Sequence, residues 1–69
     1  MTLGELLRQR RLQLAMTLEE VSKKAGCGKG YLCDIEHDVH DPGFRLVVRL
    51  SKTLRLSVNA MARAIEGEG

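Results

Sequence analysis

A chain of 69 residues has room for one domain only, and so small a core is marginally stable by itself, which favours oligomerisation. Aromatic residues make up 3% of the chain, so the core must consist of Leu, Val, Ile, Met and Ala, which suits packed helices. A net charge of +2 is compatible with nucleic-acid binding, while the absence of a membrane-spanning run, a secretory signal and a disulfide framework predicts a cytoplasmic protein with two free thiols.

The first predicted helix covers residues 2–14. Thr2 and Glu5 have the spacing of a capping box, in which each residue satisfies a backbone N–H of the other. Its apolar side consists of Leu3, Leu6, Leu7 and Leu14. We interpret Arg8 and Arg10 as a solvated basic face.

Residues 17–36 have the pattern of two short helices joined by a tight turn. Thr17 and Glu20 form a second candidate capping box, and Gly26 follows where a helix end favours a left-handed residue. The second helix runs from about residue 29 to 36. This arrangement is typical of a helix-turn-helix, whose second helix enters the major groove of DNA.

A helical projection at 100° per residue divides the 29–36 helix into two faces. The inner face holds Tyr31, Leu32 and Ile35, with Glu36 at its margin. The outward face, which DNA would meet, holds Gly30, Cys33, Asp34 and His37, with Lys29 on the flank.

Two further helices complete the predicted domain, residues 1–66. Pro42 and Gly43 are expected to begin a helix that ends near Leu54, because Pro suits a first helical position. Its apolar face is broad and consists of Phe44, Val47, Val48, Leu50 and Leu54. Arg55 must then accept a left-handed turn or reshape it. Ser57 is expected to cap a last helix over 58–65, and 67–69 is predicted to be a disordered tail.

The whole pattern resembles the helix-turn-helix family of phage repressors, Cro proteins and XRE-like bacterial regulators. The resemblance covers residues 3–65 without an insertion. It is carried by Arg11, Thr17, Val21, Gly26, Tyr31, Leu32, Ile35, Glu36, Asp41, Pro42, Phe44, Val47, Val48, Leu50, Lys52, Leu54, Leu56 and Ser57. It implies an all-α, lambda-repressor-like domain of five short helices. The implied function is sequence-specific binding of double-stranded DNA as a homodimeric, repressor-like transcriptional regulator.

The resemblance also implies roles for individual residues. Arg11 and Glu36 would form a partly buried structural pair that sets the angle of the reading helix. Lys29 is the best candidate for reading guanine, while Tyr31 and the amides at the starts of the second and fourth helices would hold phosphates. The full DNA-binding set is Thr17, Leu18, Gly28, Lys29, Gly30, Tyr31, Cys33, Asp34 and His37. The predicted dimer interface is Arg55, Leu56, Val58 and Met61.

The reading face departs from the family pattern, which leaves an alternative function open. Leu18 replaces the frequent phosphate-binding Gln, and Asp38 and Asp41 in the following loop are expected to repel phosphates. Gly28 and Gly30 either permit close approach to DNA or simply weaken the helix. Asp34 either repels phosphates or accepts a hydrogen bond from cytosine N4. The alternative is a helix-turn-helix scaffold with an eroded DNA face that acts in protein interaction.

Cysteine and histidine near the reading helix raise the question of a metal or catalytic site. Cys33, His37 and His40, with Cys27 and Asp38 nearby, lack the paired ligand spacing of zinc sites. A Cys33–His37 nucleophile and base would lack a third orienting group. We therefore predict no metal, no cofactor, no small-molecule ligand and no enzymatic activity.

Overall fold

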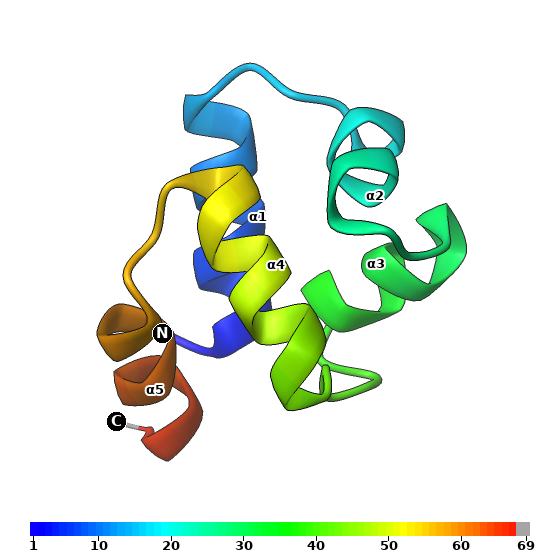
Figure 1. The fold of residues 1–69 in the computed structure, drawn as a ribbon. Helices are drawn as coiled ribbons and strands as arrows, with labels where there is room; N and C mark the ends of the chain where they lie inside the picture. Colours follow the sequence, from blue (N-terminus) through cyan, green and yellow to red (C-terminus); the bar gives the residue numbers. More distant parts are fainter. Residues whose placement is uncertain (68–69) are drawn as a thin grey trace.

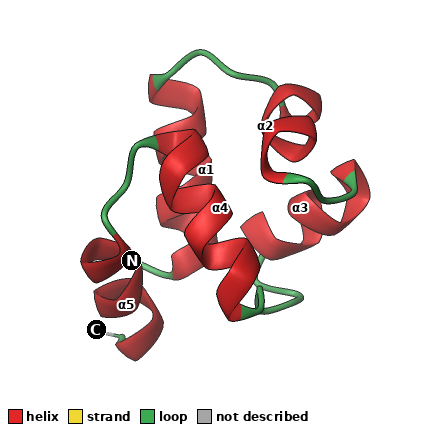
Figure 2. Cartoon of the chain, viewed as in Figure 1, coloured by secondary structure: helices red, strands yellow, loops and turns green. Residues whose placement is uncertain are grey.

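The computed structural model describes residues 1–67, which form five helices and, within that range, no strand (Figure 1, Figure 2). The helices are α1 (Leu3–Gln13), α2 (Leu18–Ala25), α3 (Lys29–Glu36), α4 (Phe44–Leu54) and α5 (Val58–Glu66). The predicted all-α fold is confirmed. In the predicted tail, Gly67 forms the C-cap of α5, and residues 68–69 lie outside the described residues.

Side-chain caps explain where three of the helices begin. At α1, Thr2 Oγ1 accepts a hydrogen bond from the Glu5 amide at 3.1 Å, and the Glu5 carboxylate accepts one from the Thr2 amide at 2.8 Å. Thr17 and Glu20 form the same reciprocal box at α2. Ser57 caps α5. Each such cap stabilises its helix by about 1 kcal/mol, so these starts follow from local sequence.

The start of α4 was predicted one or two residues too early. Gly43 is the N-cap, with the extended backbone of φ −69° and ψ 168°, so Pro42 lies before the helix. Neither Gly43 nor Gly28, the N-cap of α3, has a side chain that can accept a hydrogen bond. The first amides of α3 and α4 therefore have no side-chain cap.

All five helices contribute to one core, and α4 lies at its centre. α4 packs against α1, α2 and α5, while α3 packs against α1 and α2 (Figure 1). The buried apolar side chains are Leu3, Leu7, Val21, Ala25, Leu32, Ile35, Val47, Leu50, Leu54 and Met61. Burying a side chain of this kind contributes about 1.5–3 kcal/mol, so this cluster is the main source of stability.

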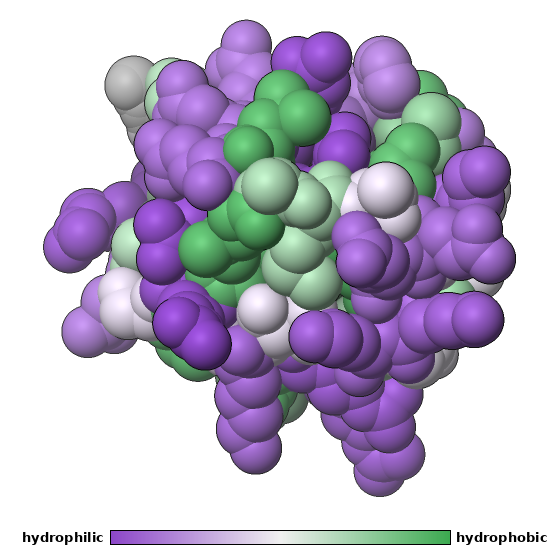
Figure 3. All heavy atoms as spheres, turned by 90° about the horizontal axis from the view of Figure 1, so that it is seen from above, coloured by the Kyte–Doolittle hydropathy of each residue, from purple (hydrophilic) through white to green (hydrophobic). Residues whose placement is uncertain are grey.

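Met61 corrects the predicted dimer interface. Its side chain is 0% exposed, because α5 turns it into the core, so a partner chain has no access to it. Leu56 is half-buried and packs against the same core, whereas Arg55 and Val58 are exposed. In the view of Figure 3, apolar side chains gather near the centre of the face and hydrophilic ones surround them.

The predicted apolar face of α4 is only partly buried. Phe44 is 75% exposed and Val48 is half-buried, whereas Val47, Leu50 and Leu54 are buried in the core. No helix within residues 1–67 has the length and apolar character that crossing a bilayer requires.

The turn between α4 and α5 uses a left-handed residue, one of the two outcomes predicted for Arg55. Its φ is 55° and ψ is 44°, a conformation that costs a non-glycine residue about 1–2 kcal/mol. Arg10 contributes to this turn, because its Nε donates a hydrogen bond to the carbonyl of Leu54 at 2.9 Å. The prediction that Arg10 is simply solvated was therefore wrong.

Candidate nucleic-acid interface

Gly26, Cys27 and Gly28 form the tight turn between α2 and α3. Gly26 has φ 74° and ψ 40°, the left-handed conformation predicted for this position. The Cys27 amide donates to the carbonyl of Ser22 at 2.9 Å, which closes the last turn of α2. Burial raises the pKa of the Cys27 thiol, so this cysteine is a structural residue rather than an activated nucleophile.

The two faces of α3 separate largely as predicted. Leu32, Ile35 and Glu36 are buried on the inner side. On the other side, Lys29, Gly30 and His37 are exposed and Cys33 and Asp34 are half-buried. α3 therefore presents a short polar ridge with glycine at its second position.

The helical projection placed Tyr31 on the inner face of α3, and this prediction was wrong. Its side chain is 40% exposed. Its hydroxyl donates to the carbonyl of Asp41 at 3.4 Å, and its ring packs against that of His40 with 5.5 Å between the centroids. The loop between α3 and α4 draws Tyr31 outward, an interaction that the helical projection by itself does not contain.

The two predicted DNA contacts at the start of α2, Thr17 and Leu18, differ in exposure. Thr17 is exposed, and its hydroxyl accepts the Glu20 amide. Leu18 is half-buried and packs against the core, so its side chain has a structural role in place of the polar contact that many relatives make.

Arg11 and Glu36 form a bidentate pair that joins α1 to the end of α3. Arg11 Nε and Nη2 donate to the two carboxylate oxygens of Glu36 at 2.8 and 3.0 Å, and Nη1 donates to the carbonyl of Met16 at 3.0 Å. The side chains of Arg11 and Glu36 are only 11% and 3% exposed. The hydrogen bond with Glu36 raises the pKa of the Arg11 guanidinium, so the guanidinium remains charged.

A second connection between α1 and α3 was not predicted from the sequence. Asp38, in a left-handed conformation with φ 61°, follows the C-cap of α3. Its carboxylate accepts hydrogen bonds from Thr2 Oγ1 at 2.7 Å and from the Gly4 amide at 3.1 Å. The carboxylate thus lies at the positive N-terminus of α1, which compensates its charge and weakens the phosphate repulsion expected of it.

Because Gly4 has no side chain, the backbone of α1 can lie directly against the backbone at the end of α3. A Cβ atom at Gly4 would lie 2.5 Å from the carbonyl oxygens of both Ile35 and Glu36, and 2.7 Å from Asp38 Oδ1. Glycine is unfavourable inside a helix, and a glycine in the first turn of a predicted helix was the sequence signal for this close packing. Asp directly after a helix end, where left-handed residues are common, was the corresponding signal for Asp38.

The loop after α3 folds back onto the reading helix. His40 Nε2 lies 3.5 Å from Asp34 Oδ2, and both side chains are 49% exposed. The Val39 amide donates to the carbonyl of Asp34 at 2.8 Å. Asp34 is therefore in contact with this loop through both its backbone and its side chain.

Cys33 and His37 lie together but are not arranged for catalysis. Cys33 Sγ is 3.7 Å from His37 Nδ1, and the same Nδ1 lies 2.8 Å from the carbonyl of Cys33. A carbonyl oxygen can only accept, so Nδ1 makes this hydrogen bond in the tautomer that carries its proton there, and in that tautomer it has no lone pair with which to accept the thiol proton. Within residues 1–67, no three Cys, His, Asp or Glu side chains are grouped as a metal site would require.

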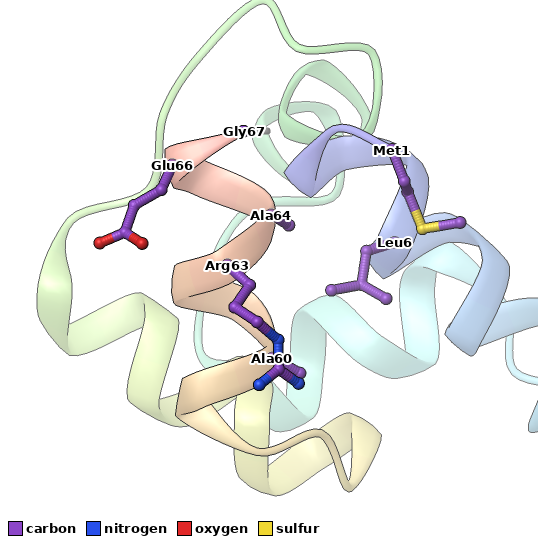
Figure 4. Close-up of a pocket in the computed structure, with 7 residues that line it drawn as sticks. All are labelled: Met1, Leu6, Ala60, Arg63, Ala64, Glu66 and Gly67. Carbon is purple, nitrogen blue, oxygen red and sulfur yellow. The ribbon is translucent and has the colours of Figure 1, made fainter. Parts of the chain in front are cut away.

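A groove with a volume of about 620 Å³ lies away from α3, between the start of α1 and α5. Met1 and Leu6 face α5 across it, and the Glu66 carboxylate points away from them (Figure 4). It lacks convergent polar groups, so we assign no ligand to it.

The capping box at α2 predicts a specific dependence of stability on pH. Hydrogen bonds from the backbone and side chain of Thr17 lower the pKa of Glu20 from its ordinary value of 4.5. A lowered pKa means that the ionised carboxylate stabilises the fold above pH 4.5 and loses this effect as the pH falls through the folded value. Glu20→Gln, which keeps a capping side chain, is expected to be less stable than wild type at pH 7 and equally stable once the pH is low enough to protonate Glu20 in the folded state. Urea denaturation at several pH values tests this, and a difference independent of pH would contradict it.

Comparison with known proteins supports the helix-turn-helix geometry. Residues 2–64 match a family model described as a helix-turn-helix domain. No curated protein matches the chain. The fold is similar to that of the N-terminal DNA-binding domain of SinR from Bacillus subtilis, with a TM-score of 0.83 and 27% identity over 94% of this chain and 96% of that one.

The fold is also similar to that of the P22 c2 repressor protein, solved in complex with synthetic operator 9T in the presence of Tl+. The TM-score is 0.87, with 24% identity over 99% of this chain and 98% of that one, a likeness that shows the fold alone. The family match spans nearly all of the 69 residues, and α2, the Gly26 turn and α3 have the geometry it requires. The chain therefore belongs to the helix-turn-helix domain family.

Proposed function

We propose that this chain is a DNA-binding transcriptional regulator that reads the major groove with α3. The observation that carries the proposal is the contrast between the two faces of α3. The inner face is fixed to α1 by the Arg11–Glu36 pair and by Asp38, while Lys29 and its exposed neighbours are left facing outward. Family membership and the name of one similar structure, a DNA-binding domain, support the same function.

Phosphate contacts would come from helix starts and from Tyr31. The first amides of α2, α3 and α4 point along helix axes whose N-terminal ends are positive, which favours an anion. Gly28 and Gly43, as N-caps, have no side chain to compete for these amides. A protein bound to an operator in this way would act sterically, by excluding or recruiting polymerase. The proposed location is therefore the cytoplasm, and the nucleoid when the protein is bound to DNA.

Base reading would rest on Lys29 and Asp34. The Lys29 ammonium can donate to guanine O6 or N7, and the Asp34 carboxylate can accept from cytosine N4. These two preferences together favour a site rich in G·C pairs. Thr17, Gly28, Gly30, Cys33 and His37 complete the proposed contact surface.

The test begins with selection of duplexes from a randomised pool, which requires no knowledge of the operator. The best recovered duplex, here called the selected duplex, is then titrated beside a scrambled duplex of equal composition at one fixed salt concentration. Lys29→Ala is expected to weaken the selected duplex by about 1–3 kcal/mol. Arg63→Ala, which removes one positive charge from α5 beside the groove of Figure 4, is the matched control.

Asp34→Asn separates the two roles left open for this carboxylate. Loss of cytosine reading is expected to weaken the selected duplex by about 1–3 kcal/mol while the scrambled duplex binds better. Equal tightening of both duplexes would mean that Asp34 only repels phosphate. If no duplex is enriched and neither substitution matters, the protein-interaction alternative replaces the proposed function.

We also propose that the chain acts as a homodimer through the region of Arg55, Leu56 and Val58, with Met61 excluded by its burial. A two-fold dimer would place the two α3 helices about 34 Å apart, one turn of DNA. Sedimentation at ~100 μM is expected to show dimer, and Val58→Asp, which places a charge on the exposed apolar position, is expected to yield monomer. Monomer alone, both with and without the selected duplex, would exclude this assembly.

A further inference from the structure

We propose that His40 is a positioning residue for base reading by Asp34: it holds one carboxylate oxygen, so that the other faces the DNA. This inference rests on the proposed function and adds a specificity-determining residue that lies outside the reading helix. His40 belongs to the loop between α3 and α4, four residues beyond the end of α3.

The geometry connects His40 to two residues of the reading helix. His40 Nε2 lies 3.5 Å from Asp34 Oδ2. The His40 ring packs against the Tyr31 ring at 5.5 Å between centroids, with 31° between the planes. The Tyr31 hydroxyl donates to the carbonyl of Asp41, so Tyr31 is itself held by the same loop. The imidazole thus lies against Tyr31 and reaches Asp34 with one nitrogen.

The two oxygens of Asp34 then have different environments. Oδ2 lies 3.5 Å from His40 Nε2, which within residues 1–67 is the one ion-pair contact of the Asp34 carboxylate. A carboxylate that reads cytosine needs one free oxygen in a defined direction, and a second partner on the other oxygen limits its rotation. His40 supplies that partner from outside the helix.

A double-mutant cycle in DNA binding tests whether His40 acts through Asp34. His40→Ala is expected to lower the ratio of selected to scrambled affinity by about 2–5-fold, the range expected for an exposed pair. His40→Gln, whose amide N–H can donate to the same carboxylate, is expected to restore most of that ratio. In the Asp34→Asn background, His40→Ala is expected to leave the ratio unchanged.

A second cycle without DNA separates this inference from the proposed function. Urea midpoints of wild type, His40→Ala, Asp34→Asn and the double variant are expected to show an energetic coupling between the two positions. Absence of coupling, or equal effects of His40→Ala on the ratio in both backgrounds, overturns the inference while DNA binding stands. Coupling without any selective DNA binding overturns the proposed function, and the positioning role with it.

Discussion

Gly4→Ala is expected to destabilise the domain by at least about 3 kcal/mol, although it adds a single methyl group. The new Cβ would lie 2.5 Å from two backbone carbonyl oxygens at the end of α3, and neither can rotate away as a side chain would. Relief requires α1 to move away from α3, which also breaks the hydrogen bond from the Gly4 amide to Asp38. Urea denaturation followed by circular dichroism measures the loss.

Gly30→Ala is the matched control for this substitution. Gly30 is also helical, but no atom lies within 4 Å of a Cβ built there. The same change is therefore expected to stabilise the domain by roughly 0.5–1 kcal/mol through the higher helix propensity of Ala. If Gly4→Ala and Gly30→Ala shifted stability in the same direction, the close approach of α1 to α3 would be wrong.

Arg11→Ala is expected to cost about 3 kcal/mol, which lowers the Tm of so small a domain by roughly 10–20 °C. The substitution leaves the Glu36 carboxylate, only 3% exposed, without its partner, and also removes the donor to the Met16 carbonyl. Arg11→Lys is expected to recover only part of the loss, because an ammonium cannot form the bidentate contact. Thermal melting at pH 7 provides the measurement.

Two further variants distinguish a stranded charge from a general loss of packing. Arg8→Ala removes an exposed arginine from the same helix and is expected to change stability by less than about 0.5 kcal/mol. The double variant Arg11→Met, Glu36→Leu leaves no buried charge and is expected to recover most of the stability. A double variant no more stable than Arg11→Ala would show that the ion pair itself, rather than the burial of a lone carboxylate, sets the energy.

Four residues join α1 to the C-terminal end of α3, namely Gly4, Arg11, Glu36 and Asp38. Substitutions at these positions are therefore expected to affect DNA reading as well as stability. The reading helix is short, with eight residues, and its own N-cap makes no side-chain bond. Its orientation therefore depends on contacts at its other end. Variants that loosen this end are expected to lose the preference for the selected duplex before they lose attraction to DNA in general, since phosphate contacts tolerate small rotations better than base contacts do.

Features that depend on neighbours along the chain were predictable from the sequence. The capping boxes at Thr2 and Thr17, the cap at Ser57 and the left-handed Gly26 each involve residues within about four positions of one another. Such short-range hydrogen bonds and backbone preferences hold whatever the rest of the fold does. The resemblance to a known family also predicted the Arg11–Glu36 pair, including its partial burial.

Features that depend on how helices meet were decided by the tertiary structure. Met61 has the spacing of either a core or an interface residue, and only the packing of α5 places it inside. From the sequence, Asp38 was expected to repel phosphate, but the fold places its carboxylate at the N-terminus of α1. Tyr31 lies outward because its hydroxyl donates to the loop between α3 and α4. The sequence by itself determined the helices, most of their ends and the family. The reading face and its supports required the fold, because their contacts join residues 10 to 36 positions apart, and such contacts have no periodicity that a single chain displays.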